Sequence, residues 1–180
     1  MCSLDGQAFQ VCLSPKSYSS LGTGAHQLAM LGIDNAGNVS SNLIYSWTID
    51  QTPPTVTVAS RPNSFVNVTT ASFSFSGADS GGGSIAQYRC SIDAGSYSVC
   101  SSPISYSALA QGVHTFNVKA IDSAGNSSNV SSETWTIDLV APIVTISSPA
   151  SNGAVIPVTQ LGNYTIAGTC TESDTVVSLT

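Results

Sequence analysis

Five cysteines are the most reactive side chains in this sequence of 180 residues, and four of them form two pairs with the same spacing. Cys2 and Cys12 stand ten residues apart, and so do Cys90 and Cys100. The second pair is symmetric about a glycine, so an unbulged hairpin turning at residues 94–96 would place its cysteines directly opposite each other, close enough for a disulfide. We therefore predict two disulfides, which persist in oxidising compartments.

Two other states of these four cysteines stay open from the sequence, namely free thiols and metal ligands. A structural zinc site needs four ligands, and neither pair has a second ligand pair close by in the sequence. The disulfide is therefore favoured. Cys170 is the odd cysteine, and we expect its partner to lie beyond residue 180.

The only histidines are His26 and His114, and a hydrolase would need one of them beside an activated nucleophile. No Gly-x-Ser-x-Gly elbow accompanies either of them. Each stands near the start of an alternating segment, on its apolar face, which is typical of a structural histidine at one end of a β-sandwich. We predict no catalytic residue and a protein that is not an enzyme.

Aspartates are the best metal candidates. Residues 34–38 and 122–126 share the pattern Asp-x-Ala-Gly-Asn, and Asp50 and Asp138 each end an alternating segment. Calcium takes six to eight oxygen ligands, which such carboxylates can supply. Asp and Asn also close turns through their own backbone, and one carboxylate per turn is few for calcium. The sequence favours turn chemistry and no cofactor, with calcium as the one candidate ion.

Strands must position all of these residues, because apolar and polar side chains alternate along several segments. Residues 72–76 read SFSFS, residues 113–122 place His114, Phe116, Val118 and Ala120 on one face, and residues 133–138 do the same with Trp135 and Ile137. Turn signals recur about every ten residues between these segments. The fold predicted is all-β, in tandem sandwiches with almost no helix.

Charge excludes two classes of partner. The net charge is -6, and the four cations, Lys16, Arg61, Arg89 and Lys119, are scattered singly. Nucleic-acid binding needs a basic stripe, so we predict no nucleic-acid partner. No apolar run approaches the about 20 residues of a membrane span, so we predict no membrane insertion in this segment.

An internal repeat organises the chain. Aligning Cys2 with Cys90 gives an offset of 88, which then holds without a gap into the proline-containing segment after Asp138. The matched pairs include Cys12 with Cys100, His26 with His114, Asp34 with Asp122, Trp47 with Trp135 and Asp50 with Asp138. A period near 90 residues suits one β-sandwich per repeat.

The second copy, YRCSIDAGSYSVCSSPISYSALAQGVHTFNVKAIDSAGNSS followed by ETWTIDLVAP, resembles the bacterial Ig-like, fibronectin type III-like repeats of large secreted or cell-surface proteins. The first copy, beginning CSLDGQAFQVC, resembles them equally. Residues 143–180 resemble the opening strands of a different bacterial Ig-like subfamily, with Gly168, Thr169 and Cys170 on the second strand. The resemblance implies a β-sandwich architecture and an extracellular or cell-surface location in a bacterium.

We divide the chain accordingly into residues 1–50, the later part of a first repeat, residues 51–138, a complete repeat, and residues 139–180, the opening of a third, divergent domain. Half a sandwich exposes its core face and a strand edge, and it is not expected to be stable in water. Two explanations stay open. The chain is a section of a longer array, or strands from another molecule complete the partial domains, as in head-to-tail strand addition.

Three functions follow from these features. The first is a non-enzymatic stalk or spacer module of a bacterial adhesin or fibre, whose partners are neighbouring Ig-like repeats of the same or another chain. The second is a module that binds a host or prey surface protein or a glycan, or a fibre subunit that self-associates by strand exchange. The third, an enzyme or its accessory domain, is disfavoured because no carboxylate pair or triad recurs.

Overall fold

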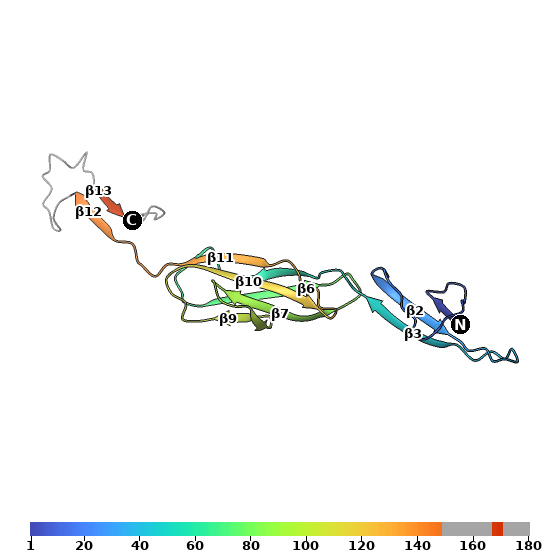
Figure 1. Ribbon diagram of the computed structural model, residues 1–180. Coiled ribbons are helices and arrows are strands. Elements are labelled where there is room, and N and C mark those ends of the chain that lie inside the picture. Colours follow the sequence, from blue (N-terminus) through green and yellow to red (C-terminus); the bar gives the residue numbers. More distant parts are fainter. Residues whose placement is uncertain (149–166, 171–180) are drawn as a thin grey trace. The chain divides into compact units, whose positions relative to one another are not determined.

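A computed structural model describes residues 1–148 and 167–170, and all regular structure in that part of the chain is β (Figure 1). The strands are β1 Cys2–Leu4, β2 Gly24–Met30, β3 Leu43–Ile49, β4 Thr55–Ser60, β5 Phe65–Val66, β6 Ala71–Ala78, β7 Ile85–Ile92, β8 Ser98–Cys100, β9 Ile104–Tyr106, β10 Gly112–Asp122, β11 Ser131–Ile137, β12 Val144–Ser148 and β13 Ala167–Cys170. The all-β prediction is confirmed. The described residues include no helix long and apolar enough to cross a membrane.

The chain divides into two compact units, residues 1–138 and residues 139–180. Within the first unit, two sheets lie in residues 51–138, which we call the complete repeat. One has the strand order β5-β11-β10-β7-β8 and the other the order β4-β6-β9. All neighbours are antiparallel except β11 and β5, which run parallel.

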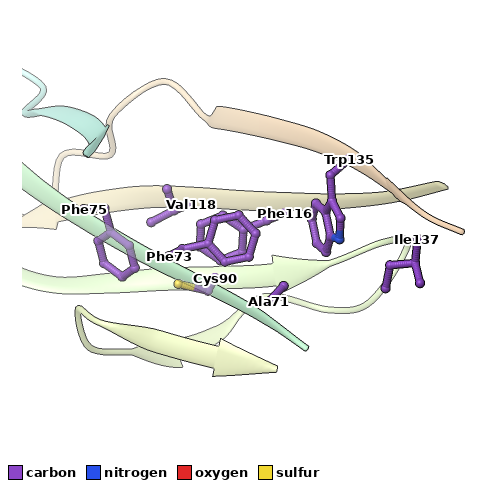
Figure 2. Close-up of a cluster of buried hydrophobic side chains, with 8 residues drawn as sticks. All are labelled: Ala71, Phe73, Phe75, Cys90, Phe116, Val118, Trp135 and Ile137. Carbon is purple, nitrogen blue, oxygen red and sulfur yellow. The ribbon is translucent and has the colours of Figure 1, made fainter. Parts of the chain in front are cut away.

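The core of the complete repeat lies between these two sheets (Figure 2). Its buried members are Ala71, Phe73, Phe75, Cys90, Phe116, Val118, Trp135 and Ile137. Phe73 of β6 stacks on Phe116 of β10 with ring centroids 4.1 Å apart, and this pair joins the two layers. The alternation of the sequence predicted these inward faces, because successive side chains of a strand point to opposite sides of a sheet.

Residues 1–50, which we call the head, contribute a three-stranded sheet in the order β1-β2-β3. Its register repeats that of the complete repeat with an offset of 88. Cys2 lies opposite Met30 and His26 opposite Trp47, as Cys90 lies opposite Val118 and His114 opposite Trp135. The described part of the head contains no second sheet, so its inward face is only partly buried.

In the second unit, β12 and β13 pair antiparallel, with Val144 opposite Cys170 and Ile146 opposite Gly168. The predicted second strand at residues 168–170 therefore lies in a strand of the structure. The remaining predictions for residues 149–166 and 171–180 lie outside the described residues, and so does the pairing of the Cys170 side chain.

Candidate functional site: three aspartates that meet where strands end

Three aspartates from distant parts of the sequence meet in the first unit. Asp50 directly follows β3, Asp79 directly follows β6, and Asp122 is the last residue of β10. One carboxylate oxygen of each lies within 4.8 Å of those of the other two. The three side chains form a group that we call the aspartate cluster.

Asp122 is the most buried member of the aspartate cluster, with 2% of its surface exposed. Its Oδ1 accepts hydrogen bonds from the backbone N–H groups of Ala124 (2.9 Å) and Asn126 (2.8 Å), and its Oδ2 accepts one from Asn126 Nδ2 (2.9 Å). Burial raises the pKa of Asp122, but the bonds from Asn126 and Ala124 outweigh it and hold this pKa below its ordinary value. Asp122 is therefore a carboxylate at neutral pH.

In both Asp50 and Asp79, one carboxylate oxygen accepts a hydrogen bond from the backbone and the other oxygen accepts none. Asp50 Oδ1 accepts from the N–H of Thr52 (2.9 Å), and Asp79 Oδ1 accepts from the N–H of Gly81 (3.0 Å). The Oδ2 atoms of both residues are buried and have no hydrogen-bond partner. A buried acceptor without a donor is costly, and such atoms are rare in folded proteins.

The loop of three glycines after Asp79 lies directly against these oxygens. A Cβ atom added to Gly83 would stand 2.7 Å from Asp50 Oδ2, 2.8 Å from Asp79 Oδ2 and 3.0 Å from Ser123 Oγ. A Cβ on Gly81 would overlap Asp50 Oδ1. The glycines are needed here because the loop backbone approaches the carboxylates more closely than any side chain would allow.

The sequence predicted part of this cluster. Asp50 and Asp122 were among the metal candidates, and the structure brings them together. Asp34 and Asp138, the other candidates, are not members of the aspartate cluster. Asp34 closes its own turn by accepting from Ala36 N–H, Asn38 N–H and Asn38 Nδ2, so the turn chemistry predicted for this pattern is confirmed.

Asp79 was missed because its contribution depends on folding. The available signal was the segment Asp-Ser-Gly-Gly-Gly, where an aspartate precedes backbone that can approach closely. Nothing in the spacing of residues 50, 79 and 122 shows that the ends of β3, β6 and β10 converge.

The histidines occupy structural positions, as predicted. His114 is 7% exposed, its Nε2 lies 2.8 Å from the carbonyl oxygen of Ala110, and its Nδ1 lies 3.0 Å from Asp93 Oδ2. Both partners are acceptors, which favours the doubly protonated imidazolium. The Ala110 carbonyl and the Asp93 carboxylate therefore raise the pKa of His114 above its ordinary value.

Asp93 also ties its own turn to the neighbouring strand. Its Oδ1 accepts from the N–H of Thr115 on β10 at 2.9 Å. Burial raises the pKa of Asp93, but the bonds from Thr115 and His114 outweigh it and leave this pKa below its ordinary value. The head repeats the arrangement, with the two ring nitrogens of His26 at 2.9 Å from the Gly22 carbonyl and 2.8 Å from Asp5.

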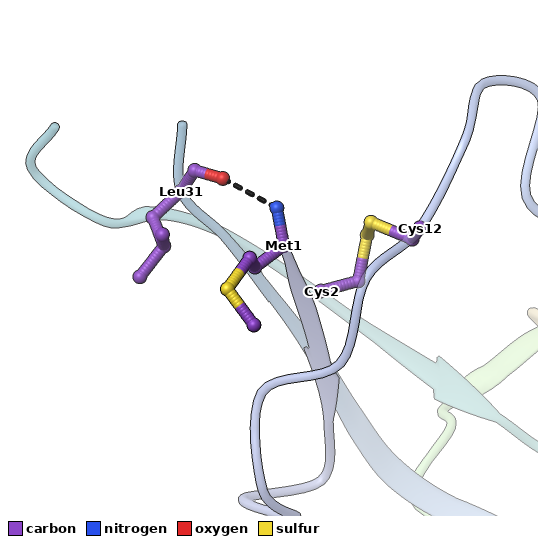
Figure 3. Close-up of a disulfide and its surroundings, with 4 residues drawn as sticks. All are labelled: Met1, Cys2, Cys12 and Leu31. Carbon is purple, nitrogen blue, oxygen red and sulfur yellow. Dashed lines mark hydrogen bonds between the residues drawn. A yellow bond between two sulfur atoms is a disulfide. The ribbon is translucent and has the colours of Figure 1, made fainter. Parts of the chain in front are cut away.

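Both cysteine pairs are disulfides in the structure, each with a Cα separation of 5.8 Å. Figure 3 shows the bond between Cys2 and Cys12 beside the amino group of Met1, which donates to the carbonyl of Leu31 at 2.6 Å. The separation lies within the range that a disulfide accepts.

The predicted hairpin register was wrong. Cys90 lies opposite Ser98 and Cys100 lies opposite Tyr88, so the two cysteines are diagonal neighbours rather than opposite partners. The turn forms one residue earlier than predicted, because the N–H of Gly95 donates to the carbonyl of Ile92 and Asp93 takes a left-handed φ of 53°. The spacing of ten residues still brings the sulfurs together.

Comparison with known proteins gives one family match. A family model described as "Bacterial Ig-like domain (group 3)" matches residues 102–180, a range that begins inside the complete repeat and runs into the second unit. No curated protein matches the chain.

Among solved structures, the fibronectin(III)-like modules of Clostridium thermocellum CbhA align at 21% identity with a TM-score of 0.40. The alignment covers 65% of this chain and 64% of that one, so the chain spans less than two thirds of the length of that relative. The family match shows that residues 102–180 are similar to a bacterial Ig-like domain, and the complete repeat folds as a two-sheet β-sandwich.

Proposed function

We propose that this chain is a non-enzymatic structural module, a stalk or spacer within a bacterial extracellular adhesin or fibre. One observation carries the proposal. The same three-strand unit occurs twice at an offset of 88 residues, with the same strand register and the same disulfide. Repetition of a whole unit lengthens a protein, whereas a catalytic or binding site needs only one copy.

Two further features support an extracellular spacer. Two disulfides in a chain of this size suit an oxidising compartment. The segment Gln51 to Pro54 leads from the head into β4 at the start of the complete repeat; it is short and contains two prolines, which stiffen a linker. The nearest neighbours of such a module are other Ig-like repeats of the same or another chain.

Small-angle X-ray scattering of the 180-residue chain tests the spacer. A compact protein of this length has a radius of gyration of about 16 Å. A spacer should give a value at least half as large again and a distance distribution with a long tail. A radius of gyration near the compact value would contradict the proposal.

A second candidate is a subunit that self-associates, with strands of another copy completing the head. One observation favours it. In the head, Leu28, Met30 and Trp47 are only partly buried, whereas their equivalents Phe116, Val118 and Trp135 are buried. Sedimentation velocity from about 5 to 500 μM separates the two candidates, because strand addition predicts species that grow with concentration and a passive spacer predicts a monomer.

A further inference from the structure

We propose that Asp50, Asp79 and Asp122 bind a calcium ion. This inference does not rest on the proposed function, because a cation site can be present in a spacer, a binding module or a self-associating subunit. It rests on the two buried oxygens without donors, on the separations within the aspartate cluster, and on the glycine loop that lies against it.

The separations suit one ion. Protein oxygens bind calcium at 2.3–2.6 Å, so two oxygens on one ion lie at most about 5 Å apart. One oxygen from each of the three carboxylates lies within 4.8 Å of the other two. A single calcium ion can therefore reach all three.

The hydrogen bonds orient the cluster toward such an ion. The backbone N–H groups of Thr52 and Gly81 hold the Oδ1 atoms of Asp50 and Asp79, and this fixes where their Oδ2 atoms point. Those Oδ2 atoms are buried and lack any donor, so they provide two unused acceptors inside the cluster. Asp122 is held through Ala124 and Asn126. Partners that orient metal ligands in this way are common around metal sites.

Charge favours a cation at the same place. Among the described residues, the ion pairs of Asp5, Asp93 and Glu133 do not include a member of the aspartate cluster. Like charges at the separations within this cluster repel each other, and they do so more strongly near a protein surface than in water. A cation would relieve the repulsion among three carboxylates within 4.8 Å of one another, and no cationic side chain in the described part of the chain pairs with them.

The donor set favours calcium over zinc and magnesium. All three side chains offer oxygen, and the cluster includes no cysteine or histidine, which zinc prefers. Magnesium demands near-ideal octahedral geometry and keeps its waters, whereas calcium accepts irregular oxygen sets. The backbone of Gly81 and Gly83 lies directly against the carboxylates, since a Cβ added to either would stand within 3 Å of an oxygen of Asp50.

The ion would link segments distant in sequence. Asp50 belongs to the end of the head, while Asp79 and Asp122 belong to the complete repeat. Asn126 Nδ2 already donates to the carbonyl of Asp50 at 3.1 Å. Calcium would add a second and stronger connection at the start of the linker, so it should restrict the motion of residues 51–54.

The experiment uses the 180-residue chain treated with a chelator and then dialysed. Calorimetric titration with CaCl2 should show one site per chain, in the range of about 10⁻⁴–10⁻³ M that is common in extracellular modules. Addition of 10 mM CaCl2 should raise the melting temperature by about 4–8 °C, because the ion binds only the folded state. Addition of 10 mM MgCl2 should give less than half of that rise.

Asp79→Asn keeps the size of the side chain and removes its charge, and it should weaken calcium binding at least tenfold. Asp34→Asn is the matched control, because Asp34 occupies the position of Asp122 in the head but stands outside the aspartate cluster; calcium affinity should be unchanged. Absence of binding by the unaltered chain up to 10 mM would overturn the proposal. So would unchanged affinity in Asp79→Asn or an equal effect of magnesium. None of these readouts depends on the scattering result, so the two proposals can fail separately.

Discussion

The head sheet and its counterpart in the complete repeat are built alike and differ in what covers them. Strands β1, β2 and β3 repeat the register of β7, β10 and β11, and both sheets carry the same disulfide and the same histidine–aspartate pair. In the described part of the chain, the sheet of the complete repeat faces a second sheet, formed by β4, β6 and β9, and the head sheet faces none.

The difference teaches where the stability of this domain resides. Trp135 is buried, while the equivalent Trp47 is partly exposed, although each stacks on its histidine in almost the same way. Strand pairing and disulfides recur without the facing sheet. Among the residues that the structure describes, full burial of the aromatic side chains is found only in the complete repeat, and burial of apolar surface is the dominant favourable contribution to folding.

Truncating one inward-facing side chain in each region should give the largest difference in the free energy of unfolding. Phe116→Ala should lower the free energy of unfolding by about 3–5 kcal/mol, because Phe116 is fully buried against Phe73. Leu28→Ala, the equivalent change in the head, should cost less than about half of that. Urea unfolding of the full chain measures both, and equal losses would show that the head has a covered core.

Removing one disulfide at a time should give the next largest loss of stability. Each closes a loop of the same length, so either double substitution, Cys2→Ser with Cys12→Ser or Cys90→Ser with Cys100→Ser, should cost about 2–3 kcal/mol of the free energy of unfolding. The loss in the complete repeat should be slightly the larger of the two, because Cys90 is 2% exposed and belongs to the core cluster, whereas Cys2 is 8% exposed and lies outside that cluster. Thermal unfolding under non-reducing conditions would reveal a reversed order.

The equivalent turns closed by Asp34 in the head and Asp122 in the complete repeat should differ in their contribution to stability, by a smaller amount. Asp122→Ala leaves the backbone N–H groups of Ala124 and Asn126 without their acceptor in a buried place, which should cost about 1–3 kcal/mol. Asp34→Ala removes the same bonds from an exposed turn, where water replaces the carboxylate, so its cost should be below about 1 kcal/mol. Denaturation in the presence of a chelator separates this effect from calcium binding, and equal costs would count against burial as the cause.

The histidine–aspartate pairs should have the smallest effect on stability, and this effect depends on pH. The folded pKa of His114 is raised, so the stability it contributes is full below its unfolded pKa of about 6.5 and is lost as pH rises through the folded value. The folded pKa of Asp93 is lowered, so its contribution is full above about 3.9 and is lost as pH falls through the folded value. The melting temperature should therefore be highest between about pH 4 and 6.5 and should decline above that range.

Histidine titration by NMR checks the same prediction at single residues. Both His114 and His26 should titrate above the ordinary pKa of about 6.5, because each faces a backbone carbonyl and a carboxylate. Asp93→Asn should lower the pKa of His114 and leave that of His26 unchanged. A pKa at or below the ordinary value in the unaltered chain would contradict the structural role.

Local patterns in the sequence determined much of this protein. Alternation predicted the buried faces of β6, β10 and β11, since the side-chain period of a strand is fixed by its backbone. The spacing of ten residues matched the cysteines that the structure pairs, and the offset of 88 related the head to the complete repeat. These features depend on residues close together in the chain or on whole copied segments.

Only the tertiary structure decided the hairpin register and the aspartate cluster. The hairpin register depends on the left-handed conformation of Asp93, which is stabilised by contacts to Thr115 and His114 on another strand. The aspartate cluster forms because the ends of β3, β6 and β10 lie close together, and this brings Asp79 near Asp50 and Asp122. Both depend on groups more than 20 residues apart in sequence, and their approach is set by how the strands pair and pack rather than by any local pattern.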